Sequence, residues 1–81
     1  MKPKTTEAYE IRLSQKQHVF FTVSSDDFSE CEQIALAKIE KKRGIEGLGG
    51  CITMRAYAVS YMLDRTPVYD WIYTEPFPFR F

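Results

Sequence analysis

The chain has 81 residues, too few for two hydrophobic cores, so we expect a single domain spanning residues 1–81. Hydrophobic residues at 44% and charged residues at 27% exclude an intrinsically disordered chain. Eleven basic and eleven acidic residues cancel, so no overall charge attracts nucleic acid, an anionic membrane or a basic partner.

The N-terminal segment MKPKTTEAYE lacks the apolar stretch of a secretory signal. No apolar run approaches the roughly 20 residues that a membrane-spanning helix needs. We therefore expect a cytoplasmic protein that does not associate with membranes. Cys31 and Cys51 lack the paired CxxC spacing, and in the cytoplasm both are expected to be reduced, apolar and buried rather than joined in a disulfide.

Two strands are predicted first. Residues 7–14 alternate apolar Tyr9, Ile11 and Leu13 with polar side chains, as a half-buried strand does. The segment HVFFTVS, residues 18–24, alternates in the same way and completes a hairpin. In this second strand, alternation predicts one face with Val19, Phe21 and Val23. The other face is predicted to carry His18, Phe20 and Thr22.

A helix is predicted next, over residues 30–43. Ser29 and Glu32 match a capping box, in which two side chains satisfy backbone N–H groups of the first turn. The predicted apolar stripe comprises Cys31, Ile34, Ala35 and Ile39. Cations in KKRG suit the C-terminal end of the helix dipole, and Gly44 is the expected C-terminal cap. The glycine-rich residues 44–50 are predicted to be a mobile connection outside the regular elements.

Residues 51–62 fit a strand or a helix, and their β-branched and aromatic content favours a strand. A turn at residues 64–67 leads to another strand, VYDWIYT, which Pro76 and Pro78 are expected to end. The order β-β-α-β-β predicts an α+β fold, with one helix on one face of a four-stranded antiparallel sheet. Because a helix about 10 Å wide cannot cover a four-stranded sheet about 15 Å across, part of the sheet should stay open.

No motif indicates a reaction, and we expect neither an enzyme nor a cofactor. His18 is the one histidine, it lies within an apolar strand, and no G-x-S-x-G turn accompanies it. A zinc site from His18, Cys31 and Cys51 lacks close ligand spacing. The glycines follow a helix instead of preceding one, so they do not match a phosphate-binding loop.

Candidate partner-binding residues form an acidic and an aromatic group. The acidic group, in DDFSECE, either complements the helix dipole or faces a basic partner; its members are Asp26, Asp27, Glu30 and Glu32. The second group is predicted on the open sheet face, where it would stack nucleic-acid bases or anchor a protein; its members are Phe20, Arg55, Tyr57 and Tyr61. The C-terminal PFPFRF is expected to fold back onto the protein's own core.

The chain's layout resembles the small anti-CRISPR proteins of phages and mobile elements. The features that carry the resemblance are the short length, the initial hairpin, the helix DDFSECEQIALAKIEKK and the aromatic end DWIYTEPFPFRF. The resemblance implies a non-enzymatic inhibitor, acting in the cytoplasm of a bacterial host, that binds a subunit of a type I CRISPR effector complex. It would block the DNA-binding or nuclease-recruiting surface of that complex.

Two other functions stay open. The first alternative is a small protein that binds single-stranded nucleic acid through the aromatic sheet face, although the neutral charge disfavours direct nucleic-acid binding. The second is a homodimer formed through the open sheet face, with a regulatory role. Many anti-CRISPR proteins are acidic DNA mimics, whereas this chain is neutral, so DDFSECE is its one candidate for such mimicry.

Overall fold

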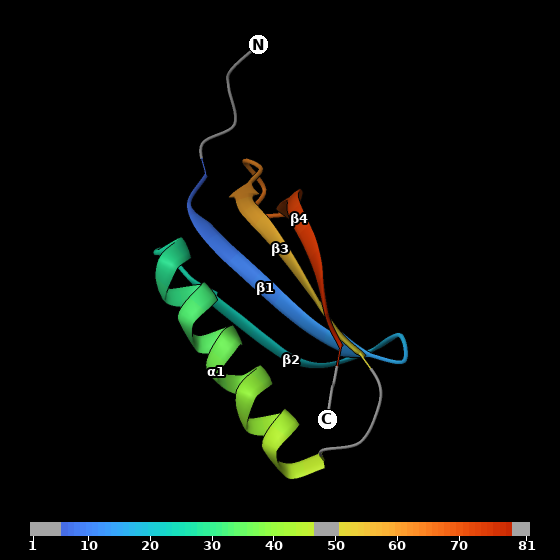
Figure 1. Ribbon diagram of the computed structural model, residues 1–81. Coiled ribbons are helices and arrows are strands. Elements are labelled where there is room, and N and C mark those ends of the chain that lie inside the picture. Colours follow the sequence, from blue (N-terminus) through green and yellow to red (C-terminus); the bar gives the residue numbers. More distant parts are fainter. Residues whose placement is uncertain (1–5, 47–50, 79–81) are drawn as a thin grey trace.

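The computed structural model describes the backbone of residues 6–46 and 51–78 and the side chains of residues 6–42 and 51–77. Its elements are β1 (Ala8–Gln15), β2 (His18–Ser25), α1 (Phe28–Glu46), β3 (Cys51–Tyr61) and β4 (Pro67–Pro78) (Figure 1). This order confirms the predicted β-β-α-β-β arrangement and the α+β fold. The ambiguous segment after the glycines is a strand throughout β3.

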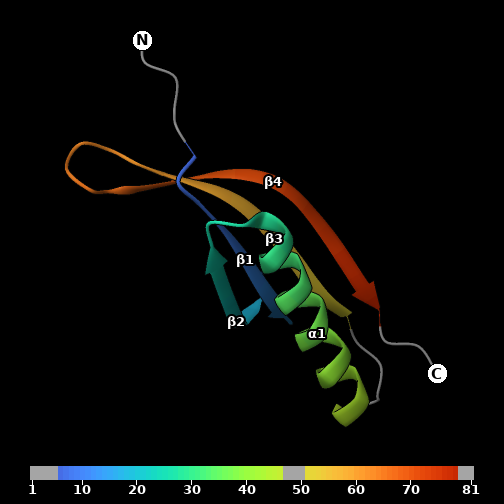
Figure 2. The ribbon, with the colours of Figure 1, turned by 90° about the vertical axis from the view of Figure 1, so that its left-hand side faces the viewer.

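The strands form one antiparallel sheet in the order β2-β1-β3-β4. α1 packs on one side of this sheet, against β1 and β2 (Figure 1). Figure 2 shows the hairpin of β3 and β4 projecting beyond the other two strands. Within the described ranges the structure offers no helix with the length and apolar character that a membrane span requires.

The core lies between α1 and the two central strands. Fully or almost fully buried apolar side chains come from β1, α1 and β3: Ile11, Leu13, Cys31, Ala35, Ile39, Ile52, Met54 and Ala56. The helix contributes every fourth residue, which keeps its buried side chains in line on one face. Ile34 lies about 100° away from Ala35 around the helix and is 39% exposed, so its predicted place in the core was wrong.

The helix begins at Phe28, two residues earlier than predicted, because Asp27 provides the cap. The Asp27 Oδ1 accepts hydrogen bonds from the backbone N–H groups of Ser29, at 2.9 Å, and Glu30, at 3.4 Å. Asp is as good an N-cap as Ser, so the first turn is capped two residues earlier than a Ser29 cap would place it. The helix continues through Gly44 to Glu46, so the predicted glycine cap was also wrong. A glycine inside a helix costs only about 1 kcal/mol, which the added helical hydrogen bonds can offset.

A β-bulge in β2 changes which side chains face the helix. Leu13 pairs with Phe21 and Ser14 pairs with Val19, which leaves Phe20 without a partner in the ladder. Beyond the bulge the alternation is reversed, and Val19 is 55% exposed on the side away from α1. Phe20 packs against the core, with the Lys42 Nζ 4.6 Å from its ring centroid. The predicted placement of Phe20 on the open face was therefore wrong.

A second β-bulge lies in β4. Ala56 pairs with Tyr73 and Tyr57 pairs with Trp71, so Ile72 is the extra residue. Residues directly opposite each other share a face of the sheet. Tyr73 therefore lies on the helix side with Ala56, whereas Trp71 lies on the opposite side with Tyr57.

β4 runs to Pro78, although Pro76 and Pro78 were predicted to end the pairing. An edge strand tolerates proline because one of its two rows of backbone groups faces solvent. Phe77 pairs with Ile52 and packs against the core, so this part of the C-terminal segment does fold back as expected. Phe79 and Phe81 lie outside the described residues.

The turn between β1 and β2 generates a stability prediction. Lys16 and Gln17 have φ values of 53° and 67°, the conformation of a type I′ turn. For residues other than Gly, Asn and Asp, this left-handed conformation raises the free energy of the folded chain by roughly 1–2 kcal/mol per residue. We expect the double variant Lys16→Asn, Gln17→Gly to increase the free energy of unfolding by about 1 kcal/mol, as measured by urea denaturation.

Lys16→Thr is the matched opposite change, because a β-branched residue is least tolerant of positive φ. It should lower the midpoint of the same urea transition. A midpoint for the double variant below that of the unchanged chain would contradict the assigned turn.

Candidate functional site

The sheet side that faces away from α1 carries a cluster of aromatic and arginine side chains. The register places Arg12 opposite Arg55, Tyr57 opposite Trp71, and Tyr69 opposite Val59. We call this cluster the aromatic-arginine face; its members are Arg12, Arg55, Tyr57, Tyr69 and Trp71. It spans three neighbouring strands, β1, β3 and β4.

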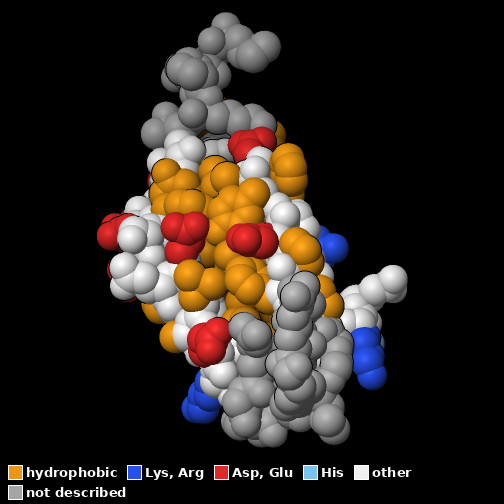
Figure 3. All heavy atoms as spheres, in the orientation of Figure 1, with side chains coloured by type: hydrophobic (Ala, Val, Ile, Leu, Met, Phe, Trp, Pro, Cys, Tyr) orange, Lys and Arg blue, Asp and Glu red, His pale blue; other side chains and the backbone are white. Residues whose placement is uncertain are grey.

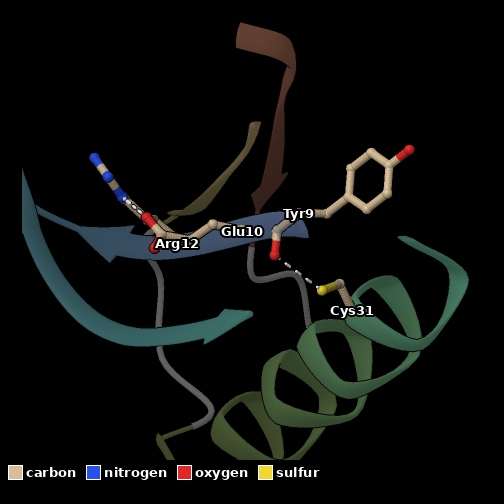
Figure 4. Close-up of polar contacts among 4 residues, drawn as sticks. All are labelled: Tyr9, Glu10, Arg12 and Cys31. Atoms are coloured by element: carbon tan, nitrogen blue, oxygen red, sulfur yellow. Dashed lines mark hydrogen bonds and ion pairs between the residues drawn. The ribbon is translucent and has the colours of Figure 1, made fainter. Parts of the chain in front are cut away.

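Arg12 is the fixed centre of this face. Its Cζ lies 4.7 Å from the ring centroids of both Tyr57 and Tyr69. The two rings are 6.1 Å apart at 79°, so the guanidinium occupies the corner between them. The Arg12 Nε donates a hydrogen bond to the Glu10 carboxylate (Figure 4). Burial alone would lower the pKa of Arg12, but the hydrogen bond and the charge of Glu10 outweigh burial and raise it.

Arg55 faces the same side but turns away from Arg12. Two like charges directly opposite each other on a sheet repel, which favours divergent side-chain directions. The Arg55 Nη1 donates to the Oγ of the buried Ser14, at 3.1 Å. Arg55 remains exposed, so its guanidinium retains donors directed to solvent.

Trp71 is the most prominent aromatic side chain of the face, since 65% of it is exposed. Its Nε1 donates a hydrogen bond to the Thr74 Oγ1, at 2.7 Å. The bulge at Ile72 brings these two side chains to one face although they are three residues apart. The hydrogen bond fixes the indole while leaving its surface accessible.

The structure brings together part of the predicted aromatic group. Arg55 and Tyr57 lie on the aromatic-arginine face, and Tyr61 follows on the same side of β3, where it lines a pocket with Glu7 and Arg65. Phe20 lies on the other side of the sheet. The prediction missed the contribution of β4, Tyr69 and Trp71.

One sequence signal could have indicated the missed residues. Both bulges fall within three consecutive apolar residues, Val19-Phe20-Phe21 and Trp71-Ile72-Tyr73. Such a run breaks strict alternation, and an extra residue in the strand can accommodate the break. In each run the first and last residues then point to opposite faces.

The predicted acidic group is divided between different contacts. Asp27 caps α1, and Glu30 accepts a hydrogen bond from the Ser25 Oγ, at 3.3 Å. Glu32 faces β4, where it accepts a hydrogen bond from the Tyr73 hydroxyl, at 2.8 Å. Asp26 is exposed before the helix. These contacts give structural roles to Asp27, Glu30 and Glu32, and binding of a basic partner by the group stays a prediction.

The cysteines are free, and they differ in environment. The Cys31 Sγ donates to the carbonyl oxygen of Tyr9, at 3.5 Å (Figure 4), and burial raises the pKa of this thiol. Cys51 is exposed, so its predicted burial was wrong.

Among the side chains that the structure describes, no three His, Cys, Asp or Glu residues are grouped so as to hold a metal ion. Comparison with family models, curated proteins and solved structures finds no match for the chain.

The contact between Tyr73 and Glu32 makes stability depend on pH. Burial and the Glu32 hydrogen bond raise the pKa of the Tyr73 hydroxyl above its ordinary value. The unfolded chain therefore loses this proton first as the pH rises above about 10, so the free energy of unfolding should fall there. We expect Tyr73→Phe to lower stability by about 1 kcal/mol at pH 7 and to reduce the decline above pH 10.

Urea denaturation between neutral and alkaline pH measures both effects. Glu32→Gln is the matched control, because it keeps an acceptor oxygen but removes the charge that opposes tyrosinate formation. It should leave the onset of the decline unchanged but make the decline smaller, because the pKa of Tyr73 in the folded protein moves closer to that in the unfolded chain. An identical pH profile for Tyr73→Phe and the unchanged chain would show that Tyr73 does not contribute to the decline.

Proposed function

We propose that the protein is a non-enzymatic protein-binding module whose contact surface is the aromatic-arginine face. The observation that carries this proposal is the exposure of Trp71, at 65%, and Tyr69, at 42%, beside an exposed Arg55. Trp, Tyr and Arg are the residue types that contribute most of the binding energy at protein interfaces. A neutral chain also suits a protein partner better than a polyanion.

The fixed geometry of the face supports the same proposal. Arg12 is held by Glu10 and two tyrosine rings, and Trp71 is held by Thr74. Side chains ordered before binding lose less conformational entropy when a partner arrives. Because the face is built on paired strands, it also needs little backbone rearrangement to bind.

The specific form of the proposal is inhibition of a type I CRISPR effector complex by occlusion. It rests on the resemblance of the chain's layout to that of small anti-CRISPR proteins. The aromatic-arginine face would bind a subunit of the complex and cover the surface that takes up DNA or recruits the nuclease. The acidic residues around Asp26 would lie near basic side chains that otherwise contact DNA phosphates.

A nucleic-acid function is the alternative that a particular observation favours. Tyr57, Tyr69 and Trp71 lie on one open sheet face beside two arginines, and single-stranded bases stack on such residues. The Arg12 charge is offset by Glu10, however, which reduces the attraction for phosphate. We therefore rank nucleic-acid binding second.

The test measures binding of the purified chain to a purified type I effector complex by biolayer interferometry. We expect Trp71→Ala and Tyr69→Ala each to weaken binding by at least about tenfold, because they remove central aromatic contacts. Ile34→Ala, at an exposed apolar site on the helix, is the matched control and should leave affinity unchanged.

Three outcomes would contradict the proposal. Absence of binding to the complex would reject the inhibitor form. Tight, salt-sensitive binding to a single-stranded oligonucleotide in a gel-shift assay, lost in Trp71→Ala, would favour the nucleic-acid alternative. A dimer in light scattering that Trp71→Ala dissociates would assign the face to self-association.

A further inference from the structure

The outer edge of β2 lacks the usual protection of a sheet edge. Edge strands expose unpaired backbone N–H and C=O groups, and proteins commonly shield them with charged residues or proline. β4, the other edge strand, contains Asp70, Glu75 and prolines. β2 contains no proline, glycine or charged Asp, Glu, Lys or Arg, and in the described part of the chain no strand pairs with its outer side. Its residues 21–25, beyond the bulge, keep a regular register with β1, so this segment can accept a further strand.

Two contacts define the flank of α1 that lies along this edge. The Ser25 Oγ donates a hydrogen bond to Glu30, at 3.3 Å. The Lys38 Nζ lies 5.2 Å from the ring centroid of Phe21. Ile34 is four residues from both Glu30 and Lys38, so these three side chains share one flank of the helix. The flank therefore follows the edge of β2 from Ser25 back to Phe21, with Ile34 in the middle.

This flank is apolar in its middle and oppositely charged at its ends. Ile34 is 39% exposed, and Phe21 and Val23 pack against the core but are only partly buried. Glu30 lies in the first turn of α1, and Lys38 lies in its second half. In Figure 3, acidic side chains lie near the start of α1 and a basic side chain lies beside its later turns. The flank is thus complementary to a reversed copy of itself, apolar to apolar and acid to base.

We propose that the protein forms a twofold dimer in which the β2 edges of two chains pair antiparallel. Pairing centred on Val23 places Phe21 of each chain opposite Ser25 of the other, and the two sheets become one continuous sheet. Because the helix flank follows the same edge, Ile34 of each chain then meets Ile34 of the other. Glu30 meets Lys38 of the other chain in two equivalent contacts.

The position of the helix fits this arrangement. α1 packs over β1 and β2, and neighbouring strands lie about 4.8 Å apart, so the two helices would lie two strand spacings, or about 9.6 Å, apart. Packed helices are separated by about 8–10 Å, so the dimer buries Ile34 without moving the helix. The aromatic-arginine face lies on the other side of the sheet and stays open in both chains. Changes at Ile34 therefore alter the dimer without altering that face.

Sedimentation velocity of the full chain tests the proposal, and it should show a dimer whose share rises with concentration. Glu30→Lys alone, or Lys38→Glu alone, places like charges at both contacts, so each should weaken the dimer at least about tenfold. An equimolar mixture of these two variants should recover a dimer, because each contact in a mixed pair again joins opposite charges. Circular dichroism should show that each variant keeps its helix.

Two exposed apolar residues of α1 provide a matched pair of variants. Ile34→Asp places a carboxylate at the centre of the interface and should dissociate the dimer. Leu36, which is 41% exposed, lies about 200° around the helix from Ile34, so Leu36→Asp should leave the dimer intact. A monomer at every concentration, undiminished dimers of the single charge variants, a mixture that stays monomeric, or a dimer lost in Leu36→Asp would each overturn the proposal.

Discussion

The two β-bulges, at Phe20 and Ile72, set the chemical character of both sides of the sheet. Each inserts one residue into an edge strand and reverses the direction of every side chain beyond it. In β2 the bulge gives Phe20 to the core, where Lys42 lies over its ring. In β4 it sends Tyr73 toward α1 and leaves Trp71 on the other side. Without the bulge in β4, its aromatic side chains would face one way, and the core would lose Tyr73 and Phe77.

The core itself depends on a narrow contact between α1 and the central strands. Cys31, Ala35 and Ile39 form the helix side, and the small Cys and Ala let the helix approach the sheet closely. Asp27 fixes where the helix begins, and the Tyr73–Glu32 hydrogen bond ties its first turns to the far edge strand. The helix backbone lies closest to β1 and β2, and its side chains help to bury the inner side of β3.

The sequence predicts the large elements because their signals are regular. In residues 7–14, apolar and polar side chains alternate over several consecutive pairs. After Asp27, an apolar side chain recurs every four residues over more than one helical turn. The bulges are missed because alternation assumes an unbroken period of two, and a single extra residue defeats it. The helix start is missed because Asp27 and Ser29 are both good caps, and only the packing of Phe28 against Tyr9 and Tyr73 selects between them. Of the aromatic-arginine face, Arg55 and Tyr57 were found, whereas Tyr69 and Trp71 required the register of β4.

The prolines of β4 have a consequence for the behaviour of the molecule in concentrated solution. β4 is a long edge strand, and an edge with free backbone groups is a template on which a neighbouring chain can add a strand. Pro76 and Pro78 remove two N–H donors from β4, and the distortion at Ile72 interrupts the remaining straight segment. Edge-to-edge pairing of one sheet with the next, a step toward fibrils, is thereby discouraged. A chain with 15% aromatic residues can then display several of them without assembling through its edge.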